Sequence, residues 1–143
     1  MFTQIQRDVL KDWDILLVED EADSRDVAER ILKFYGAKVH SATNGQSALE
    51  MLTVQSLRPK FIICDLSMPI MDGWAFVARL KRDRPTLDIP IIALTAHAML
   101  GDREKAIAAG FHNYLTKPLT AKTFMTDLLR VLVDIPELFD QLS

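Results

Sequence analysis

Residues 61–65 read Phe61-Ile62-Ile63-Cys64-Asp65, a short apolar run that ends in a carboxylate. A continuous apolar run of this length is typical of a strand in a parallel sheet, because helices cover both faces of such a sheet. Polar groups follow three other apolar runs: Glu19-Asp20 after Ile15 to Val18, Thr95 after Ile91 to Leu94, and Lys117-Pro118 after Tyr114 to Thr116. The carboxyl ends of parallel strands form one edge of a sheet, where ligands bind. We therefore expect these polar groups to converge there.

Segments with helical spacing lie between these runs. Gly36 follows one helical repeat of apolar residues and is a typical C-terminal cap, whereas Asn44 is suited to cap the start of the next helix. Residues 37–41 are interpreted as a short second strand between these two positions. The expected helices are one that ends near Tyr35, one over about residues 45–55, one that starts near Trp74, one over residues 102–109, and one capped by Thr120.

The resulting order is a strand followed by a helix, five times over. Such alternation predicts an α/β fold with a parallel sheet, helices on both faces and right-handed crossovers. A chain of 143 residues fits one domain with a true hydrophobic core. We expect this domain over residues 14–132, with an N-terminal extension over residues 1–13 and a C-terminal extension over residues 133–143.

Both extensions carry apolar residues. Phe2, Ile5, Val9 and Trp13 are three to four residues apart, which indicates a turn or two of amphipathic helix. Pro136 interrupts the last helix within an apolar segment. The extensions either pack on the domain or form an association surface.

Composition and charge narrow the function. The net charge is −3 and the basic residues are scattered, so the basic surface of a duplex-binding protein is missing and no direct nucleic-acid binding is expected. Residues 1–13 carry charges and no continuous apolar stretch, which predicts a cytoplasmic location without a membrane anchor. Cys64, the only cysteine, lies inside an apolar run and is expected to be a buried, unreactive thiol.

Three carboxylates at one edge of the sheet raise an electrostatic problem. Glu19, Asp20 and Asp65 disfavour each other's ionisation, so they either hold a shared proton or recruit a cation. Ligands that are all oxygen favour a hard divalent ion such as Mg²⁺, with Mn²⁺ as the alternative. The sequence therefore predicts a divalent metal site.

Thr95 and Lys117 add the groups that a phosphoryl pocket needs. A lysine ammonium is a compact charge suited to a phosphoryl oxygen, and a threonine hydroxyl can donate a hydrogen bond to another. Phosphoryl transfer depends mostly on positioning and charge neutralisation, so a carboxylate in such a pocket can itself be the nucleophile. Asp65, alone at the end of the central apolar run, is the candidate.

Four motifs carry a resemblance to a known family: Val18-Glu19-Asp20-Glu21, the segment from Asp65 to Gly73, Leu94-Thr95-Ala96, and the segment from Tyr114 to Leu119. Each is weak alone, but four in this order are highly specific. Over residues 14–132 the chain resembles the receiver domain of bacterial two-component response regulators. The resemblance implies a flavodoxin-like (βα)5 fold whose parallel five-stranded sheet has the order 2-1-3-4-5.

The resemblance also implies roles for the polar groups. Asp65 would accept a phosphoryl group from a histidine kinase or a phosphohistidine transfer protein. Asp20 and Asp65 would bind Mg²⁺ directly, Glu19 would bind it through water or as a further ligand, and the backbone carbonyl of Ser67 would supply another oxygen. Lys117 would hold the phosphoryl group.

Other positions would govern switching and the lifetime of the phosphoryl group. In this family the hydroxyl at Thr95 moves toward the phosphoryl group and the ring at Tyr114 turns inward. Ser67 and His97 depart from the commonest pattern and are expected to modulate dephosphorylation. The Lys117-Pro118 peptide bond would be cis. Such a domain is a signalling module, not an enzyme, although it catalyses its own phosphorylation and dephosphorylation.

The output would be the binding of an unknown downstream protein. The resemblance places it on the face of the fourth helix, fifth strand and fifth helix, where Arg103, Ala106, Tyr114 and Lys122 are the expected contacts. The chain would be a monomer or a phosphorylation-dependent dimer. Too few residues follow Leu132 for an output domain, which indicates a stand-alone domain. A receiver excised from a hybrid kinase is the alternative, and the start at Met1 argues against it.

Three other function classes fit the pattern less well. Aspartate-nucleophile phosphatases of the haloacid dehalogenase type place the nucleophile on the first strand with a second Asp two residues later, whereas here Ser67 lies two residues after Asp65. The acidic segment 19–23 would repel a flavin phosphate. Degenerate relatives that act without phosphorylation lose the acceptor or the lysine, and this sequence retains both.

Overall fold

The computed structural model describes residues 5–96 and 102–142. Within these residues, five strands form one sheet, in which every neighbouring pair is parallel and the order is β2-β1-β3-β4-β5. The strands are β1 (Asp14–Val18), β2 (Lys38–Ala42), β3 (Phe61–Asp65), β4 (Ile91–Thr95) and β5 (Asn113–Thr116). The predicted strand order and the flavodoxin-like fold are confirmed.

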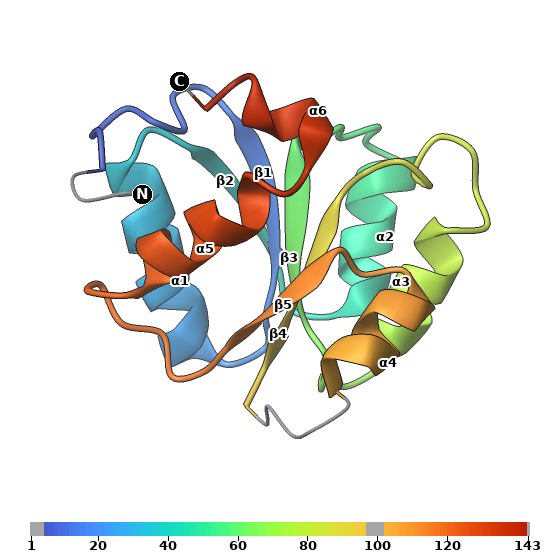
Figure 1. Cartoon of the computed structure of the whole chain (residues 1–143). Coiled ribbons are helices and arrows are strands. Elements are labelled where there is room, and N and C mark those ends of the chain that lie inside the picture. Colours follow the sequence, from blue (N-terminus) through green and yellow to red (C-terminus); the bar gives the residue numbers. More distant parts are fainter. Residues whose placement is uncertain (1–4, 97–101, 143) are drawn as a thin grey trace.

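Helices cover both faces of the sheet, as Figure 1 shows. The helices within the described residues are α1 (Ala22–Phe34), α2 (Gly45–Thr53), α3 (Gly73–Leu80), α4 (Asp102–Ala109), α5 (Phe124–Leu132) and α6 (Pro136–Phe139). α1 and α5 lie on one face, and α2, α3 and α4 lie on the other. The fold is therefore a three-layer sandwich with the sheet in the middle.

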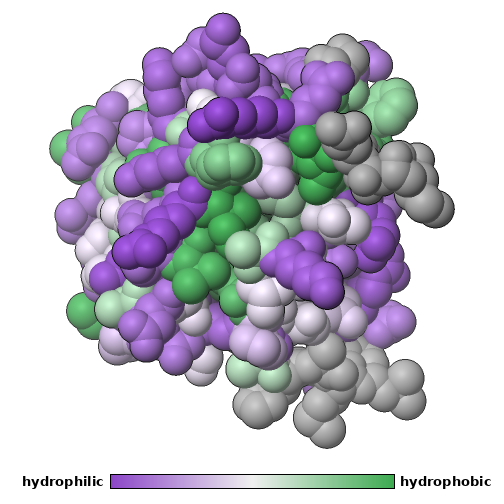
Figure 2. Space-filling view, turned by 90° about the vertical axis from the view of Figure 1, so that its left-hand side faces the viewer, coloured by the Kyte–Doolittle hydropathy of each residue, from purple (hydrophilic) through white to green (hydrophobic). Residues whose placement is uncertain are grey.

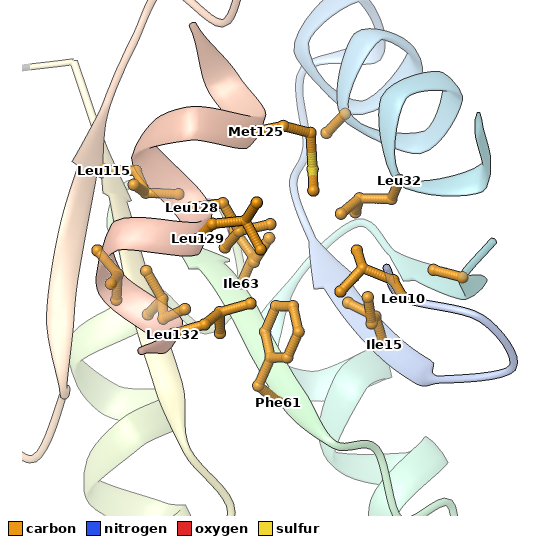
Figure 3. Close-up of a cluster of buried hydrophobic side chains, with 14 of the residues drawn as sticks. Leu10, Ile15, Leu32, Phe61, Ile63, Leu115, Met125, Leu128, Leu129 and Leu132 are labelled. Carbon is orange, nitrogen blue, oxygen red and sulfur yellow. The ribbon is translucent and has the colours of Figure 1, made fainter. Parts of the chain in front are cut away.

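The two helical layers explain why the central strands are apolar along their length. Alternate side chains of a strand point to opposite faces of the sheet. Phe61 and Ile63 of β3 belong to the core cluster under α1 and α5, which Figure 3 shows, whereas Ile62 and Cys64 belong to the cluster under α2 and α3. All four side chains are fully buried. Burying a large apolar side chain contributes roughly 1.5–3 kcal/mol, so this strand stabilises both cores.

Two of the predicted helix ends are confirmed and one is wrong. Asn44 caps α2 through a hydrogen bond that its Oδ1 accepts from Ser47 N at 2.9 Å, and Gly36 has a φ of 99° just after α1. Thr120, however, does not cap the last long helix, since α5 begins after Thr123. Thr120 instead closes the preceding turn, because its Oγ1 accepts a hydrogen bond from Thr123 N at 3.3 Å.

The described part of the N-terminal extension packs on the domain without forming a regular helix. Residues 7–12 form successive turns, so the predicted amphipathic helix is wrong for this stretch, and Phe2 lies outside the described residues. The backbone explains the difference, because Leu10 N donates to Tyr35 O at 2.9 Å and Asp12 N donates to Gly36 O at 3.0 Å. These bonds tie the segment to the turn between α1 and β2.

The C-terminal extension packs on the same core cluster. Ile135 and Leu138 are buried there, on either side of the start of α6. The ammonium of Lys60 donates to Gln141 Oε1 at 2.6 Å and lies 5.9 Å from the centre of the Trp13 ring. The two extensions therefore lie near each other at the edge of the sheet where β3 begins.

The outer side of α1 is only partly polar. Figure 2 shows hydrophobic side chains gathered at the middle of this side of the molecule, with hydrophilic residues around them. A shallow hollow of about 320 Å³ lies there, lined by Arg30, Ile31, Phe34, Tyr35 and Ala121. Within residues 5–96 and 102–142, no helix has the length and apolar character needed to cross a membrane.

Candidate functional site

The register of the sheet brings the predicted polar groups to one edge. Val18 of β1 is paired with Cys64 of β3, so Glu19 and Asp65 lie at the same level. Thr95 ends β4 beside Thr116 of β5, and Lys117 N donates to Thr95 O at 2.8 Å. The predicted convergence of these groups is therefore confirmed for the backbone positions.

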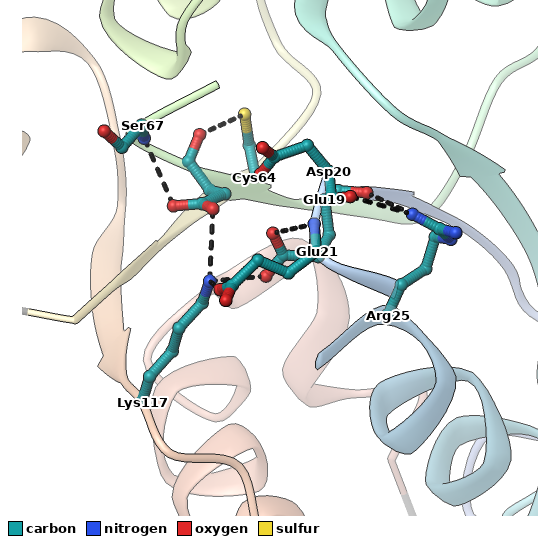
Figure 4. Close-up of polar contacts among 8 residues, drawn as sticks. Glu19, Asp20, Glu21, Arg25, Cys64, Ser67 and Lys117 are labelled. Atoms are coloured by element: carbon teal, nitrogen blue, oxygen red, sulfur yellow. Dashed lines mark hydrogen bonds and ion pairs between the residues drawn. The ribbon is translucent and has the colours of Figure 1, made fainter. Parts of the chain in front are cut away.

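The side chain of Lys117 joins three carboxylates, as Figure 4 shows. Its Nζ lies 2.7 Å from Glu19 Oε1, 2.5 Å from Glu21 Oε1 and 3.1 Å from Asp65 Oδ2. The side chains of Glu19, Asp65 and Lys117 are 0%, 7% and 11% exposed, whereas that of Glu21 is 61% exposed. One ammonium thus compensates a mostly buried set of acids.

Burial and neighbouring charges shift the pKa values of Glu19 and Lys117. Burial raises the pKa of Glu19 to about 7, and the neighbouring Asp65 adds to the rise, although Lys117 opposes it. Burial alone would lower the pKa of Lys117, but its contacts with Glu19, Glu21 and Asp65 outweigh burial and leave that pKa above its usual value. The lysine therefore stays charged at neutral pH.

The cluster has the donor set of a hard divalent cation. Within the part of the chain that the structure describes, Glu19, Glu21 and Asp65 each offer a carboxylate oxygen within 4.8 Å of the other two. Glu19 Oε1 is buried and accepts no hydrogen bond, since Lys117 Nζ approaches at ion-pair distance but outside hydrogen-bond geometry. A buried carboxylate oxygen in this position fits Mg²⁺, which prefers oxygen ligands.

Asp20 and Glu21, in the loop that follows β1, do not lie as the sequence predicted. Asp20 was expected to be a direct metal ligand, but its side chain is exposed and is not one of the three clustered carboxylates. Glu21 was missed as a site residue. Its position two residues after Glu19 was the available signal, because alternate residues of an extended segment point to the same side. The role of Asp20 as a ligand stays a prediction.

Arg25 of α1 fixes the path of the acidic loop. Its Nη1 donates to the backbone carbonyls of Glu19 at 3.0 Å and of Asp20 at 3.4 Å, as drawn in Figure 4. The amide of Glu21 donates to Glu19 Oε2 at 3.2 Å. These bonds hold the three acidic residues at the end of β1, and the sequence pattern did not reveal the part that Arg25 plays.

Asp65 is held by the loop that follows its own strand. Ser67 N donates to Asp65 Oδ1 at 3.2 Å, so the amide of Ser67 and the ammonium of Lys117 contact opposite oxygens of one carboxylate. A Cβ on Gly73 would lie 2.5 Å from the carbonyl oxygen of Asp65, which explains why glycine starts α3. Burial, with lesser effects of Asp65 and Glu19, raises the pKa of the Cys64 thiol, so this cysteine is an unreactive core residue as expected.

The remaining predicted site residues are Thr95, Tyr114, Pro118 and His97. Thr95 is buried at the end of β4, and Tyr114 is half-buried in β5, where it packs against the core cluster under α3. The Lys117-Pro118 peptide bond is cis, as the resemblance implied. His97 lies outside the described residues, so its role as a modulator stays a prediction.

The sequence of this chain is similar to those of known proteins. The family model of the response regulator receiver domain matches residues 15–129. The uncharacterized 14.6 kDa protein of Leptolyngbya boryana is 40% identical over 110 residues, which cover 77% of this chain and 82% of that protein. Two other curated relatives are longer, and the chain covers 45% and 15% of their lengths.

Solved structures show the same fold. The chemotaxis response regulator CheY4 of Vibrio cholerae is 30% identical with a TM-score of 0.76, over 85% of this chain and 100% of that one. The receiver domain of sensor histidine kinase PA1611 from Pseudomonas aeruginosa, which has a magnesium ion coordinated in its active-site cleft, is 33% identical with a TM-score of 0.72, over 83% and 96% of the two chains. The chain therefore belongs to the response regulator receiver domain family, a family of signalling domains, as its motifs, its strand order and these matches show.

Proposed function

We propose that this domain takes a phosphoryl group from a phosphohistidine onto Asp65 and signals through phosphorylation-dependent protein binding. The observation that carries the proposal is the pairing of Asp65 Oδ2 with the ammonium of Lys117 at 3.1 Å, beside the buried carboxylate of Glu19. A recessed carboxylate next to a fixed cation is suited to attack phosphorus while the cation neutralises the phosphoryl oxygens.

The transfer step follows from these positions. A carboxylate oxygen of Asp65 attacks phosphorus, and the bond between phosphorus and the imidazole nitrogen breaks. The imidazole keeps the electron pair and takes up a proton. The product is an acyl phosphate on Asp65, whose phosphoryl oxygens would contact the Lys117 ammonium and would attract the Thr95 hydroxyl. In a separate step, water attacks the phosphorus of the acyl phosphate, the bond between phosphorus and the Asp65 oxygen breaks, and inorganic phosphate leaves, so the domain also catalyses its own dephosphorylation.

A divalent ion would complete the site. Glu19, Asp20 and Asp65 would hold Mg²⁺ or Mn²⁺, the Ser67 carbonyl would supply a further oxygen, and Glu21 is an additional candidate because it lies in the carboxylate cluster. When bound, the ion supplies positive charge to the phosphoryl oxygens. The chain's own part is to orient the acids, which it does through Arg25 and through Ser67 N.

The downstream protein would bind to the face formed by α4, β5 and α5. A groove of about 400 Å³ lies there, lined by residues of all three elements that include Arg103, Tyr114 and Arg130. Movement of Thr95 toward the phosphoryl group and of Tyr114 inward would change its shape. Ala106, which was expected to contact a partner, is only 1% exposed, so that expectation is wrong and Arg103 is the α4 residue that offers a contact.

Acetyl phosphate tests the proposal directly. The wild type incubated with acetyl phosphate and Mg²⁺ should gain the mass of one phosphoryl group, and EDTA should prevent the gain. Asp65→Asn should gain none, whereas Asp83→Asn, a change at a half-buried acid outside the site, should behave like the wild type. Equal phosphorylation of the wild type and Asp65→Asn would remove Asp65 from this role.

A further inference from the structure

Ile70 has a backbone conformation that isoleucine rarely adopts. It lies in the loop between β3 and α3 with a φ of 69°, and Met71 N donates across it to Pro69 O at 2.7 Å. A hydrogen bond from residue i+2 to residue i around a positive φ defines the rare, strained form of the γ-turn. For a β-branched residue, a positive φ is an outlier, because its Cβ substituents crowd the backbone.

The side chain of Ile70 gains nothing from burial in return. It is 83% exposed, the highest exposure among the large hydrophobic residues that the structure describes. Glycine would adopt this backbone without strain, and asparagine would do so more readily than isoleucine. The fold alone therefore gives no reason for an isoleucine at this position.

The rest of the loop is held firmly. Met71 O accepts a hydrogen bond from Gly45 N of α2 at 3.0 Å, and Gly73 N donates to Leu66 O at 3.1 Å. Asp72 caps α3 by accepting from Ala75 N at 2.8 Å. With both flanks fixed, the loop presents Ile70 to solvent in one preorganised position, which lowers the entropy lost when a partner binds it.

The loop also borders the phosphoacceptor. It begins at the end of β3, its Ser67 amide contacts Asp65 Oδ1, and Gly73 packs against the Asp65 carbonyl. Because the Asp65 side chain is only 7% exposed, a phosphoimidazole must enter a recess, and the protein that carries it must come to rest on the surrounding rim. Strained backbone positions cluster at active sites, ligand clamps and switch regions.

We propose that Ile70 is a docking contact for the protein that donates the phosphoryl group, and that it inserts into an apolar depression beside the phosphohistidine of that protein. The inference rests on the proposed function, since it needs Asp65 to be the acceptor. Small phosphodonors have no surface to meet Ile70, so they phosphorylate Asp65 independently of it. The downstream partner is disfavoured as the occupant, because the groove among α4, β5 and α5 lies on other elements.

The test compares two donors on the same variants. The protein donor is the phosphorylated phosphotransfer domain of a histidine kinase that phosphorylates the wild-type chain, and the small donor is acetyl phosphate. Ile70→Gly and Ile70→Asn both keep the turn and remove the apolar side chain. Val54→Asn is the matched control, because Val54 is also β-branched and 80% exposed but ends α2 away from the loop.

We expect the second-order rate of transfer from the protein donor to fall about tenfold or more in both Ile70 variants, as for a contact residue at an interface centre, and to be unchanged in Val54→Asn. The rate with acetyl phosphate should stay at the wild-type value in all three. Unchanged transfer from the protein donor would overturn the inference, and so would an equal fall with both donors, since Ile70 would then act on the pocket itself. Failure of acetyl phosphate to phosphorylate the wild type would instead refute the proposed function.

Discussion

The ammonium of Lys117 lies 2.7 Å from Glu19 and 3.1 Å from Asp65, so in this structure one lysine neutralises the carboxylates that a metal ion would also neutralise. Lysine and a bound metal ion would therefore compete for the same negative charge, although the proposed phosphorylation needs both. This relationship makes the effects of removing the lysine on metal binding and on phosphorylation opposite in sign.

Lys117→Met should bind Mg²⁺ more tightly than the wild type, by about tenfold, because Glu19, Glu21 and Asp65 lose their shared cation and attract the ion more strongly. Phosphorylation by acetyl phosphate should nevertheless be severely slowed, since the phosphoryl oxygens lose a partner. Calorimetric titration with MgCl₂ and intact-mass kinetics measure the two effects. Lys122→Met, at an exposed lysine in the same loop, serves as the control. Weaker Mg²⁺ binding by Lys117→Met would contradict the competition.

Arg25→Met should weaken Mg²⁺ binding by about tenfold without touching a ligand, as residues that orient metal ligands commonly do. The physical reason is that Arg25 holds the carbonyls of Glu19 and Asp20, and the acidic loop loses its fixed path without it. Arg30→Met on the same helix removes only an exposed pair with Asp26 and should leave the affinity unchanged. The same calorimetric titration distinguishes them, and equal affinities for both variants would show that the loop does not depend on Arg25.

Sequence patterns predicted the parts of the site that follow directly from strand ends. A continuous apolar run precedes each of Glu19, Asp65 and Lys117. The pairing of parallel strands aligns such positions, independently of the conformation of the loops. Glu21 and Arg25 were not predicted as site residues, because their contacts depend on the path of one loop and on which carbonyls that loop turns toward α1.

The start of α5 and the backbone conformation of Ile70 could not be predicted from sequence patterns, for different reasons. The start of α5 was misplaced because Thr120 and Thr123 are both suited to cap a helix. The turn that begins at Thr120 delays the start of α5 until after Thr123, whose side chain makes no capping hydrogen bond. The positive φ of Ile70 was invisible because residue preference argues against it. It arises from hydrogen bonds that close the loop on α2 and β3.

Gly73→Ala should destabilise the domain by more than about 2 kcal/mol, because a new Cβ would lie 2.5 Å from the Asp65 carbonyl and buried overpacking is costly. Alanine is the better helix former, so helix propensity predicts the opposite sign. The comparison variant Ala78→Gly, at an exposed position of α3, should lose about 1 kcal/mol through propensity alone. Urea denaturation measures both, and a Gly73→Ala variant as stable as the wild type would show that α3 shifts freely away from Asp65.

Lys81 should make the stability of the domain depend on alkaline pH. Burial lowers its pKa below the usual value of 10.5, with Asp88 opposing the shift. The folded chain therefore releases this proton at a lower pH than the unfolded chain, so the stability contribution of Lys81 rises as pH increases toward 10.5 and is lost as pH falls through the lowered pKa. Urea denaturation between pH 8 and about pH 10 should show a steeper rise for the wild type than for Lys81→Met. Parallel curves would mean that the ammonium, which donates to Leu87 O at 2.9 Å, is as well solvated as in the unfolded chain.

Ile70→Gly should stabilise the domain even while it slows transfer from a protein donor. Relief of a positive φ at a β-branched residue is worth about 1–3 kcal/mol, and the greater freedom of glycine in the unfolded chain offsets about 1 kcal/mol of this. A net gain of about 1 kcal/mol is expected, since the exposed side chain of Ile70 contributes little by burial. Val54→Gly, at an exposed residue with αR backbone, has no strain to relieve and should lose stability instead. Urea denaturation in Mg²⁺-free buffer reports both changes, and a destabilised Ile70→Gly would mean that isoleucine stabilises its own turn, which would remove the reason to assign it a role in recognition.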